Sequence, residues 1–177
     1  MRTVEVPVEV YQPLEDLLAG QFFAEVFGWK PNEALRQRCA LPTRHGGLGI
    51  PIVTELAGQE WAAAGSLTAP LVEAICNQRI GYVGDPRAAR FRRAERLMVR
   101  DKACAEEADV MARGLMGRAA RGFQEARLDG GSAWLAVIPL DSLGLDLNAI
   151  TFRDAVALRF GLPLPEPLPG KTLSTEP

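Results

Sequence analysis

The segment from Pro86 to Leu128 constrains this chain most, because its composition strongly favours helix. It is rich in Ala, Arg, Glu, Leu and Met, and Pro86 is tolerated in a first helical turn. Gly114, Gly117 and Gly122 weaken its second half, so one long helix and two helices with a bend both fit. The arginines lie mostly off an apolar stripe at helical spacing, which predicts a core helix with a basic outer side. The stripe consists of Phe91, Ala94, Leu97, Met98, Ala105, Ala108, Met111 and Leu115.

The N-terminal half also carries helical patterns. Apolar spacing predicts a helix over residues 13–27, ended by Gly28. Asn32 is expected to cap a short helix that runs to about Ala40 and stops before Pro42. Two more helices are expected, one from near Thr54 to a break around Gly65-Ser66 and one over about residues 70–78.

The remaining segments favour turns, a last helix and two irregular ends. Ser132 is a candidate cap for a short helix over 134–137, and Asn148 for a final helix over 149–160, with Gly161 just past its end. Residues 1–12 fit either a strand or an extended arm, and prolines in 162–177 predict a disordered or polyproline-like tail. We therefore expect an all-α, irregular multi-helix bundle over residues 13–161, with an extended N-terminal arm.

Residues 41–51 form a basic, glycine-rich hinge between two predicted helices. Its sequence is LPTRHGGLGIP, which lacks both the lysine of a GxxxxGK[ST] phosphate loop and the GxGxxG spacing. Gly46, Gly47 and Gly49 are expected where the backbone needs positive φ or close approach, while Leu48 and Ile50 enter the core. The hinge is therefore interpreted as a packing element.

Basic charge is concentrated in one part of an almost neutral chain. The whole chain has 20 Lys and Arg against 22 Asp and Glu, whereas residues 87–127 contain 11 basic and 6 acidic residues. Such a segment is either a surface that contacts phosphates or an ordinary solvated helix face. The candidate nucleic-acid contacts are Arg44 and His45 in the hinge and Arg87, Arg90, Arg92, Arg93, Arg96 and Arg100 in the long helix.

The sequence shows no catalytic set. His45 is the single histidine, which excludes a metal site built on two imidazoles. Residues 82–85 have the spacing of the polymerase YxDD turn, but Gly84 stands at the first carboxylate position. Trp61, Trp134 and Phe152 are expected as core anchors. We expect no catalytic residue, metal or cofactor.

Cysteine content and hydropathy bear on the compartment. Cys39, Cys76 and Cys104 are odd in number and widely spaced, which does not suit a disulfide framework. The N-terminus lacks an apolar signal core, and no run is long enough to span a bilayer. We expect a soluble intracellular protein, cytoplasmic or nuclear, that is not secreted.

Five segments of the chain form an ordered set: QPLED at 12–16, LPTRHGGLGI at 41–50, TAPLV at 68–72, SAWL with IPL at 132–140, and FRDA with LRFG at 152–161. In this order they resemble the region downstream of the polymerase core in reverse transcriptases of non-LTR-like retroelements. The hinge is similar to an LPxRxGGLGI signature of that family, with His45 where arginine or leucine is common.

This resemblance implies a thumb or linker region that, in the parent protein, helps to grip the template-primer duplex. The parent family is an RNA-directed DNA polymerase, but the YxDD carboxylates and a CxC zinc knuckle are missing from this sequence. The partners implied are RNA or an RNA–DNA duplex, and the polymerase domain of a parent protein. The alternative is a helical protein-interaction module, or an inert remnant of a decayed element, that binds no nucleic acid.

Overall fold

The computed structural model of this 177-residue chain describes residues 7–79, 81, 83–137, 142, 144 and 147–164. Within these residues the protein is all-helical and has no strand. The elements are η1 (Val8–Tyr11), α1 (Gln12–Leu17), η2 (Leu18–Phe22), α2 (Phe23–Phe27), α3 (Glu33–Ala40), η3 (Thr43–His45), α4 (Val53–Cys76), α5 (Pro86–Gly114), α6 (Gly117–Arg127), η4 (Ala133–Ala136) and α7 (Ala149–Phe160).

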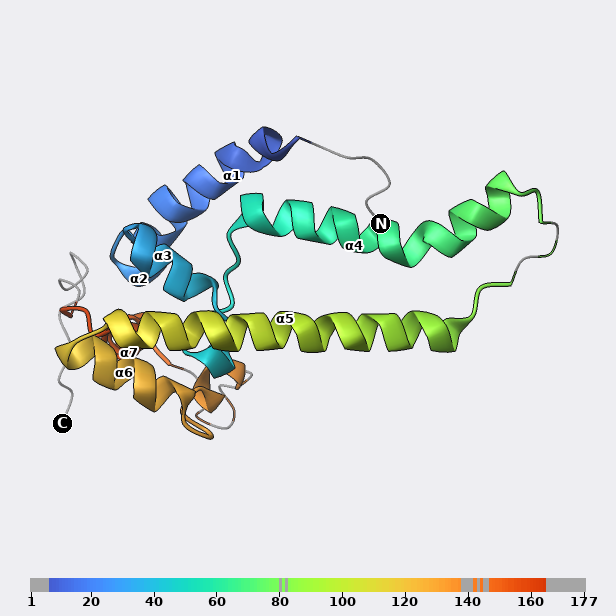
Figure 1. The fold of residues 1–177 in the computed structure, drawn as a ribbon. Helices are drawn as coiled ribbons and strands as arrows, with labels where there is room; N and C mark the ends of the chain where they lie inside the picture. The colour runs from blue at the N-terminus through green and yellow to red at the C-terminus, as the bar shows by residue number, and fades with distance from the viewer. Residues whose placement is uncertain are drawn as a thin grey trace.

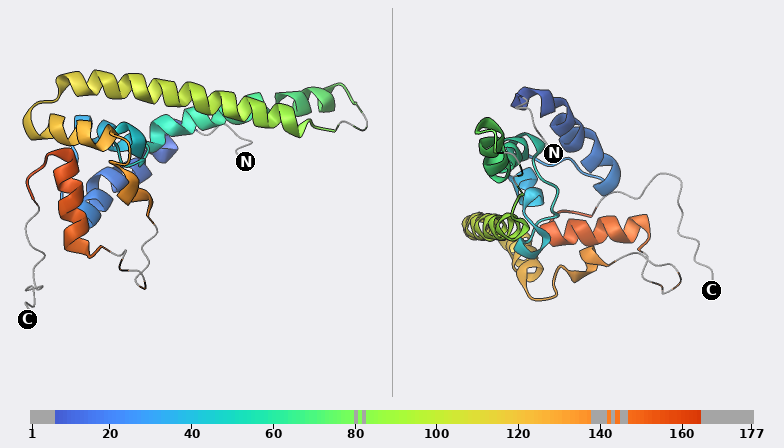
Figure 2. Two further views of the ribbon diagram at one scale, coloured as in Figure 1. Left: turned by 90° about the horizontal axis from the view of Figure 1, so that it is seen from below. Right: turned by 90° about the vertical axis from the view of Figure 1, so that its right-hand side faces the viewer.

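The molecule has a helical head from which two long helices project. Helices α1 to α3 lie on one side of the head, and α6 and α7 lie on the other (Figure 1). Helices α4 and α5 run side by side away from the head, as the views of Figure 2 also show. We call residues 61–76 and 86–100, which form the outer part of these two helices, the arm.

The predicted helix starts and stops near the hinge are confirmed. The Asn32 Oδ1 accepts from the Leu35 N–H at 2.9 Å, and α3 ends at Ala40. Gly28 ends α2 with φ of 79°, a left-handed conformation that glycine adopts without strain. The predicted helix over 13–27 is present as α1, η2 and α2 in succession, because η2 is a π-helical turn that contains Gly20.

The bounds of the last helix, α7, follow the prediction as well, whereas residues 165–177 of the predicted tail lie outside the described part. The Asn148 Oδ1 accepts from the Thr151 N–H at 2.8 Å, and Gly161 ends α7 with φ of 68°. Ser132, by contrast, does not cap η4. Its hydroxyl donates to the carbonyls of Thr43 and Ala126 at 2.7 and 2.6 Å, so it joins the hinge to α6.

Two local predictions were wrong. Val8–Tyr11 is a 3₁₀ turn that continues into α1, so residues 8–12 are neither a strand nor an extended arm; residues 1–6 lie outside the described part. The helix expected to break near Gly65-Ser66 is continuous through Pro70 to Cys76. The hydroxyls of Ser66 and Thr68 donate to carbonyls of the preceding turn, and α4 bends but does not end (Figure 1).

The long segment consists of two helices, α5 and α6, with a bend at Leu115 and Met116. Its apolar stripe is buried only near the head, where Ala108 is fully buried and Met111 and Leu115 are partly buried. Phe91, Leu97 and Met98 are exposed, so the prediction of a core helix along the whole length was wrong. The reason is that α5 extends beyond the head, and no other described element covers this part of the stripe.

Two apolar clusters hold the head together. The larger contains Phe23, Phe27, Cys39, Val156 and Phe160, and therefore joins α2 and α3 to α7. The smaller contains Leu41, Ala108 and Phe123, and joins the hinge to α5 and α6. The hinge thus lies between the two clusters, and the packing of either one fixes its position.

Gly47 and Gly58 differ in how closely other atoms surround them, and this difference tests the packing of the hinge. A Cβ at Gly47 would lie 1.9 Å from the Leu41 carbonyl oxygen, whereas a Cβ at Gly58, inside α4, would meet nothing within 4 Å. We expect Gly47→Ala to lower the free energy of unfolding by about 3 kcal/mol. The matched variant Gly58→Ala is expected to raise it by about 1 kcal/mol. Urea unfolding followed by circular dichroism measures both; equal effects would contradict this account of the hinge.

Candidate nucleic-acid interface

The hinge is a tight backbone structure built on glycine. The N–H groups of Leu48 and Ile50 both donate to the Cys39 carbonyl at 3.2 Å, and the Gly49 N–H donates to the Leu41 carbonyl at 2.9 Å. Gly46 has φ of 93°, and a Cβ there would lie 2.5 Å from the Phe123 ring. The chain therefore folds back on the end of α3, as expected for a packing element.

Two buried arginines bind the hinge carbonyls. The Arg159 guanidinium donates to the Thr43 and Gly47 carbonyls at 2.9 and 3.0 Å. The Arg36 guanidinium donates to the Ile50 and Pro51 carbonyls, at 2.7 and 2.8 Å. Glu15 pairs with Arg36 at 2.7 and 3.0 Å and also accepts from the Val53 N–H at 2.9 Å. These bonds supply side-chain donors to carbonyls at both ends of the hinge, in addition to the backbone hydrogen bonds within it.

The two candidate residues of the hinge, Arg44 and His45, both contact Asp101 of α5. The Arg44 Nε donates to the Asp101 Oδ1 at 2.7 Å, and the His45 Nε2 lies 2.6 Å from the same oxygen. These two hydrogen bonds, that of His45 first, lower the pKa of the Asp101 carboxyl. Arg44 is exposed and His45 is largely covered, so their first role here is to attach the hinge to α5.

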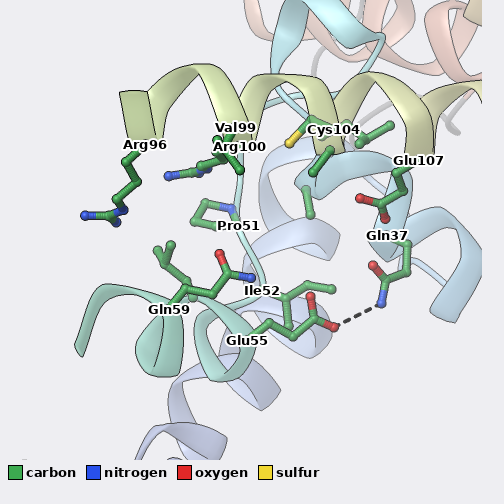
Figure 3. Close-up of a pocket in the computed structure, with 14 residues that line it drawn as sticks. Gln37, Pro51, Ile52, Glu55, Gln59, Arg96, Val99, Arg100, Cys104 and Glu107 are labelled. Carbon is green, nitrogen blue, oxygen red and sulfur yellow. Dashed lines mark hydrogen bonds between the residues drawn. The ribbon is translucent and has the colours of Figure 1, made fainter. Parts of the chain in front are cut away.

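Arg96 and Arg100 face α4 across a groove. The Arg96 guanidinium donates to the Glu60 Oε1 at 2.8 Å, and Arg100 lies 3.9 Å from the same oxygen. The groove has a volume of about 370 Å³, and Figure 3 shows Arg96 and Arg100 near one end and Glu55 and Glu107 near the other. Partial burial, and then the charge of Glu55, raise the pKa of Glu107.

The remaining arginines of the candidate set lie farther out on α5. Arg87, Arg90 and Arg93 are exposed and form no ion pair with any carboxylate of the described residues. Arg92 is half-buried, and its Nε has no hydrogen-bond partner among the described residues. The unpaired positive charge of the candidate set is therefore concentrated in the arm.

The arginines do not form one straight row. In an α-helix each step of three residues rotates a side chain by about 60° backwards around the axis. Arg96 faces α4, so Arg93, Arg90 and Arg87 turn progressively away from it. The set expected along a single phosphate backbone therefore divides into Arg96 and Arg100, which are paired with α4, and Arg87, Arg90 and Arg93, which are open to solvent.

The aromatic anchors behave differently from one another. Trp134 and Phe152 pack against the larger core cluster, with ring centroids 6.1 Å apart. Trp61 is 39% exposed, so the expectation that it is a core anchor was wrong. It lies on the arm, where α4 has left the head.

Sequence reasoning missed the buried arginines. Arg38 lies between the rings of Phe123 and Phe160, with its guanidinium carbon 4.9 and 4.7 Å from their centroids. Burial lowers the pKa of Arg38 to about 10 and raises the pKa of the neighbouring Cys39 to about 12. No local signal distinguishes Arg36, Arg38 and Arg159 from surface arginines, because their partners are distant in sequence.

Comparison of the chain with protein-family models, with curated proteins and with solved structures finds no match. Among the described residues no helix is both long and apolar enough to cross a membrane. The same residues contain no group of three His, Cys, Asp or Glu side chains placed to hold a metal ion.

The Asp101 contact predicts a pH dependence of stability. Folding lowers the pKa of the Asp101 carboxyl below 3.8, its value in the unfolded chain. The charged carboxylate therefore stabilises the native state at pH values above 3.8, and this stabilisation is lost as the pH falls through the lower pKa of the native state. We therefore expect Asp101→Asn to shift the urea midpoint downward at pH 7 and to have little effect below both pKa values. Glu95→Gln, another exposed charge on α5, is the control and should show no such difference. An equal loss for Asp101→Asn at both pH values would contradict the charge-based coupling.

Proposed function

We propose that this chain is a non-catalytic module that binds the backbone of a nucleic acid through the arm, and that it derives from the post-polymerase thumb or linker region of a retroelement reverse transcriptase. One observation carries the binding proposal. Arg87, Arg90 and Arg93 are exposed and unpaired among the described residues. When phosphates bind exposed, unpaired arginines, counterions are released from the nucleic acid, and no ion pair within the protein has to be broken first.

The position of these arginines supports the proposal. They are exposed on the part of α5 that projects beyond the head (Figure 2). Arg44 and Arg100 line one hollow of about 470 Å³ beside the hinge, but each is already near a carboxylate. They are therefore assigned a secondary role, as contacts that form if a phosphate displaces Asp101 or Glu60.

The origin of the module is supported by the order of the five motif segments. The hinge glycines of the LPTRHGGLGI segment and the aromatics of the SAWL and FRDA segments lie in or against the packed head. The hinge, SAWL and FRDA segments therefore belong to the head, whereas TAPLV at 68–72 lies on α4 in the arm and the proposed binding residues lie on α5 in the arm. Ancestry and binding are separate parts of the proposal.

Binding is tested by a triple variant and a charge-matched control. Arg87→Gln, Arg90→Gln and Arg93→Gln together should reduce affinity for an RNA–DNA duplex at low salt and lower the slope of log K against log salt by about 3. The control changes three exposed arginines outside the arm, Arg113, Arg118 and Arg121, to Gln. It should leave affinity and slope nearly unchanged.

Fluorescence anisotropy over a salt series measures both quantities. A wild-type dissociation constant weaker than about 10⁻⁴ M at low salt would exclude the proposal. Equal losses in the two triple variants would show a response to net charge and not a binding surface.

The exposed apolar residues of the arm favour a second candidate function, that of a helical protein-interaction module. Phe91 and Met98 are 70% and 73% exposed on α5, and neither is explained by contact with phosphate.

A further inference from the structure

A groove separates α4 from α5 where the arm leaves the head. The two helices lie side by side in Figures 1 and 2, but they are not among the elements whose backbones pack closely. Among the described residues, the side-chain bonds that join them are those of Glu60 with Arg96 and Arg100. The groove of about 370 Å³ that remains is within the size range of ligand sites.

The middle of this groove is apolar. Pro51 and Ile52 lie there at the entry to α4, and Val99 of α5 lies across from them (Figure 3). Val99 is 66% exposed, and contact with phosphate does not explain an apolar side chain at this position. An occupant with an apolar group at this point would remove Val99 from water.

The end of the groove near the arm carries an excess of positive charge. Arg96 and Arg100 share one carboxylate, because both lie near the Glu60 Oε1, at 2.8 and 3.9 Å. Two guanidinium groups with one carboxylate leave one positive charge without a partner. This end is therefore suited to an additional carboxylate.

The other end has unpaired negative charge. Glu55 accepts a hydrogen bond from the neutral Gln37 amide at 3.2 Å, and the Glu107 carboxylate forms no ion pair or hydrogen bond with the described residues. Partial burial, and then the charge of Glu55, raise the pKa of Glu107. A cationic group between these two glutamates would relieve their repulsion.

The separation of the two ends matches an extended peptide. Arg100 and Glu107 are seven positions apart on α5, which is about 10 Å along the axis, and Arg96 and Glu107 are about 16 Å apart. In an extended chain, residues four positions apart are about 13 Å apart and point to the same side. A free amino acid carries both its charges on one residue, so it is too short to reach both ends.

We propose that this groove binds an extended peptide segment of a partner protein, through an acidic and a basic side chain four positions apart. The acidic side chain lies at Arg96 and Arg100, and the basic side chain lies between Glu55 and Glu107. An apolar side chain midway between them covers Val99. This binding is independent of the proposed nucleic-acid binding, because the three arginines assigned to phosphate do not line the groove.

Three capped five-residue peptides test the charge pattern on the full chain. The probe is Asp-Ser-Leu-Ser-Lys, and its controls are Asp-Ser-Leu-Ser-Asp and Lys-Ser-Leu-Ser-Lys. In NMR titrations the probe should saturate with a dissociation constant of about 1 mM or tighter and shift the methyl signals of Val99. Each control should bind about fivefold more weakly, because one of its charges meets a like-charged end.

Reversing the charge of one end should switch the preference. Glu107→Lys makes both ends positive, so it should bind the peptide with two Asp residues most tightly, and Arg100→Glu should favour the peptide with two Lys residues. The matched controls are Glu106→Lys and Lys102→Glu, the same charge changes in an exposed pair of α5 that does not line the groove. Both should keep the wild-type preference. Circular dichroism checks that the variants remain helical.

Four outcomes would overturn the proposal. They are a probe that does not saturate by several millimolar, equal binding of the three peptides to the wild type, variants that keep the wild-type preference, and competition by free lysine, which would assign the groove to a small zwitterion. The triple variant Arg87→Gln, Arg90→Gln and Arg93→Gln should bind the probe normally. Its peptide and duplex affinities therefore separate the failure of one proposal from the failure of the other.

Discussion

The buried pair of Arg36 and Glu15 is the contact on which the rest of this structure depends. Its guanidinium binds the carbonyls of Ile50 and Pro51, and its carboxylate binds the N–H of Val53, the first residue of α4. One pair thus joins α1, α3, the end of the hinge and the start of α4. Removing either partner would leave a buried charge without compensation, which is far more costly than loss of an exposed ion pair.

The hinge is held at its other end by Arg159, and the buried arginines of the head differ from the arginines of the arm. Arg38 and Arg159, which are buried in the head, lie on aromatic rings or donate to backbone carbonyls, and they have structural roles. Those in the arm are exposed, half-buried as Arg92 is, or paired with Glu60. The distinction comes from packing, because only the head has enough apolar surface to bury a guanidinium together with its partners.

The arm differs from the head in what its helices bury. Leu71 and Ile75 of α4 and Phe91 and Met98 of α5 are exposed, so much of the apolar surface of the arm remains in water. This follows from helices that are longer than the head that supports them.

Helix boundaries were predictable where a local signal is decisive. Asn32, Asn148, Gly28 and Gly161 act through bonds or φ values of the adjacent turn, and all four behave as expected. Pro70 and the Gly65-Ser66 pair were misleading because Ser66 and Thr68 bond to carbonyls of the preceding turn, within a helix that continues.

The sequence by itself determined the all-helical class, the capped ends of the helices and the need for glycine in the hinge, because these depend on neighbouring residues. The tertiary structure decided which arginines are buried, that Asp101 binds Arg44 and His45, and that the stripe of α5 leaves the core at Met98. These features join residues tens of positions apart or depend on where the head ends. No spacing within a single helix contains that information.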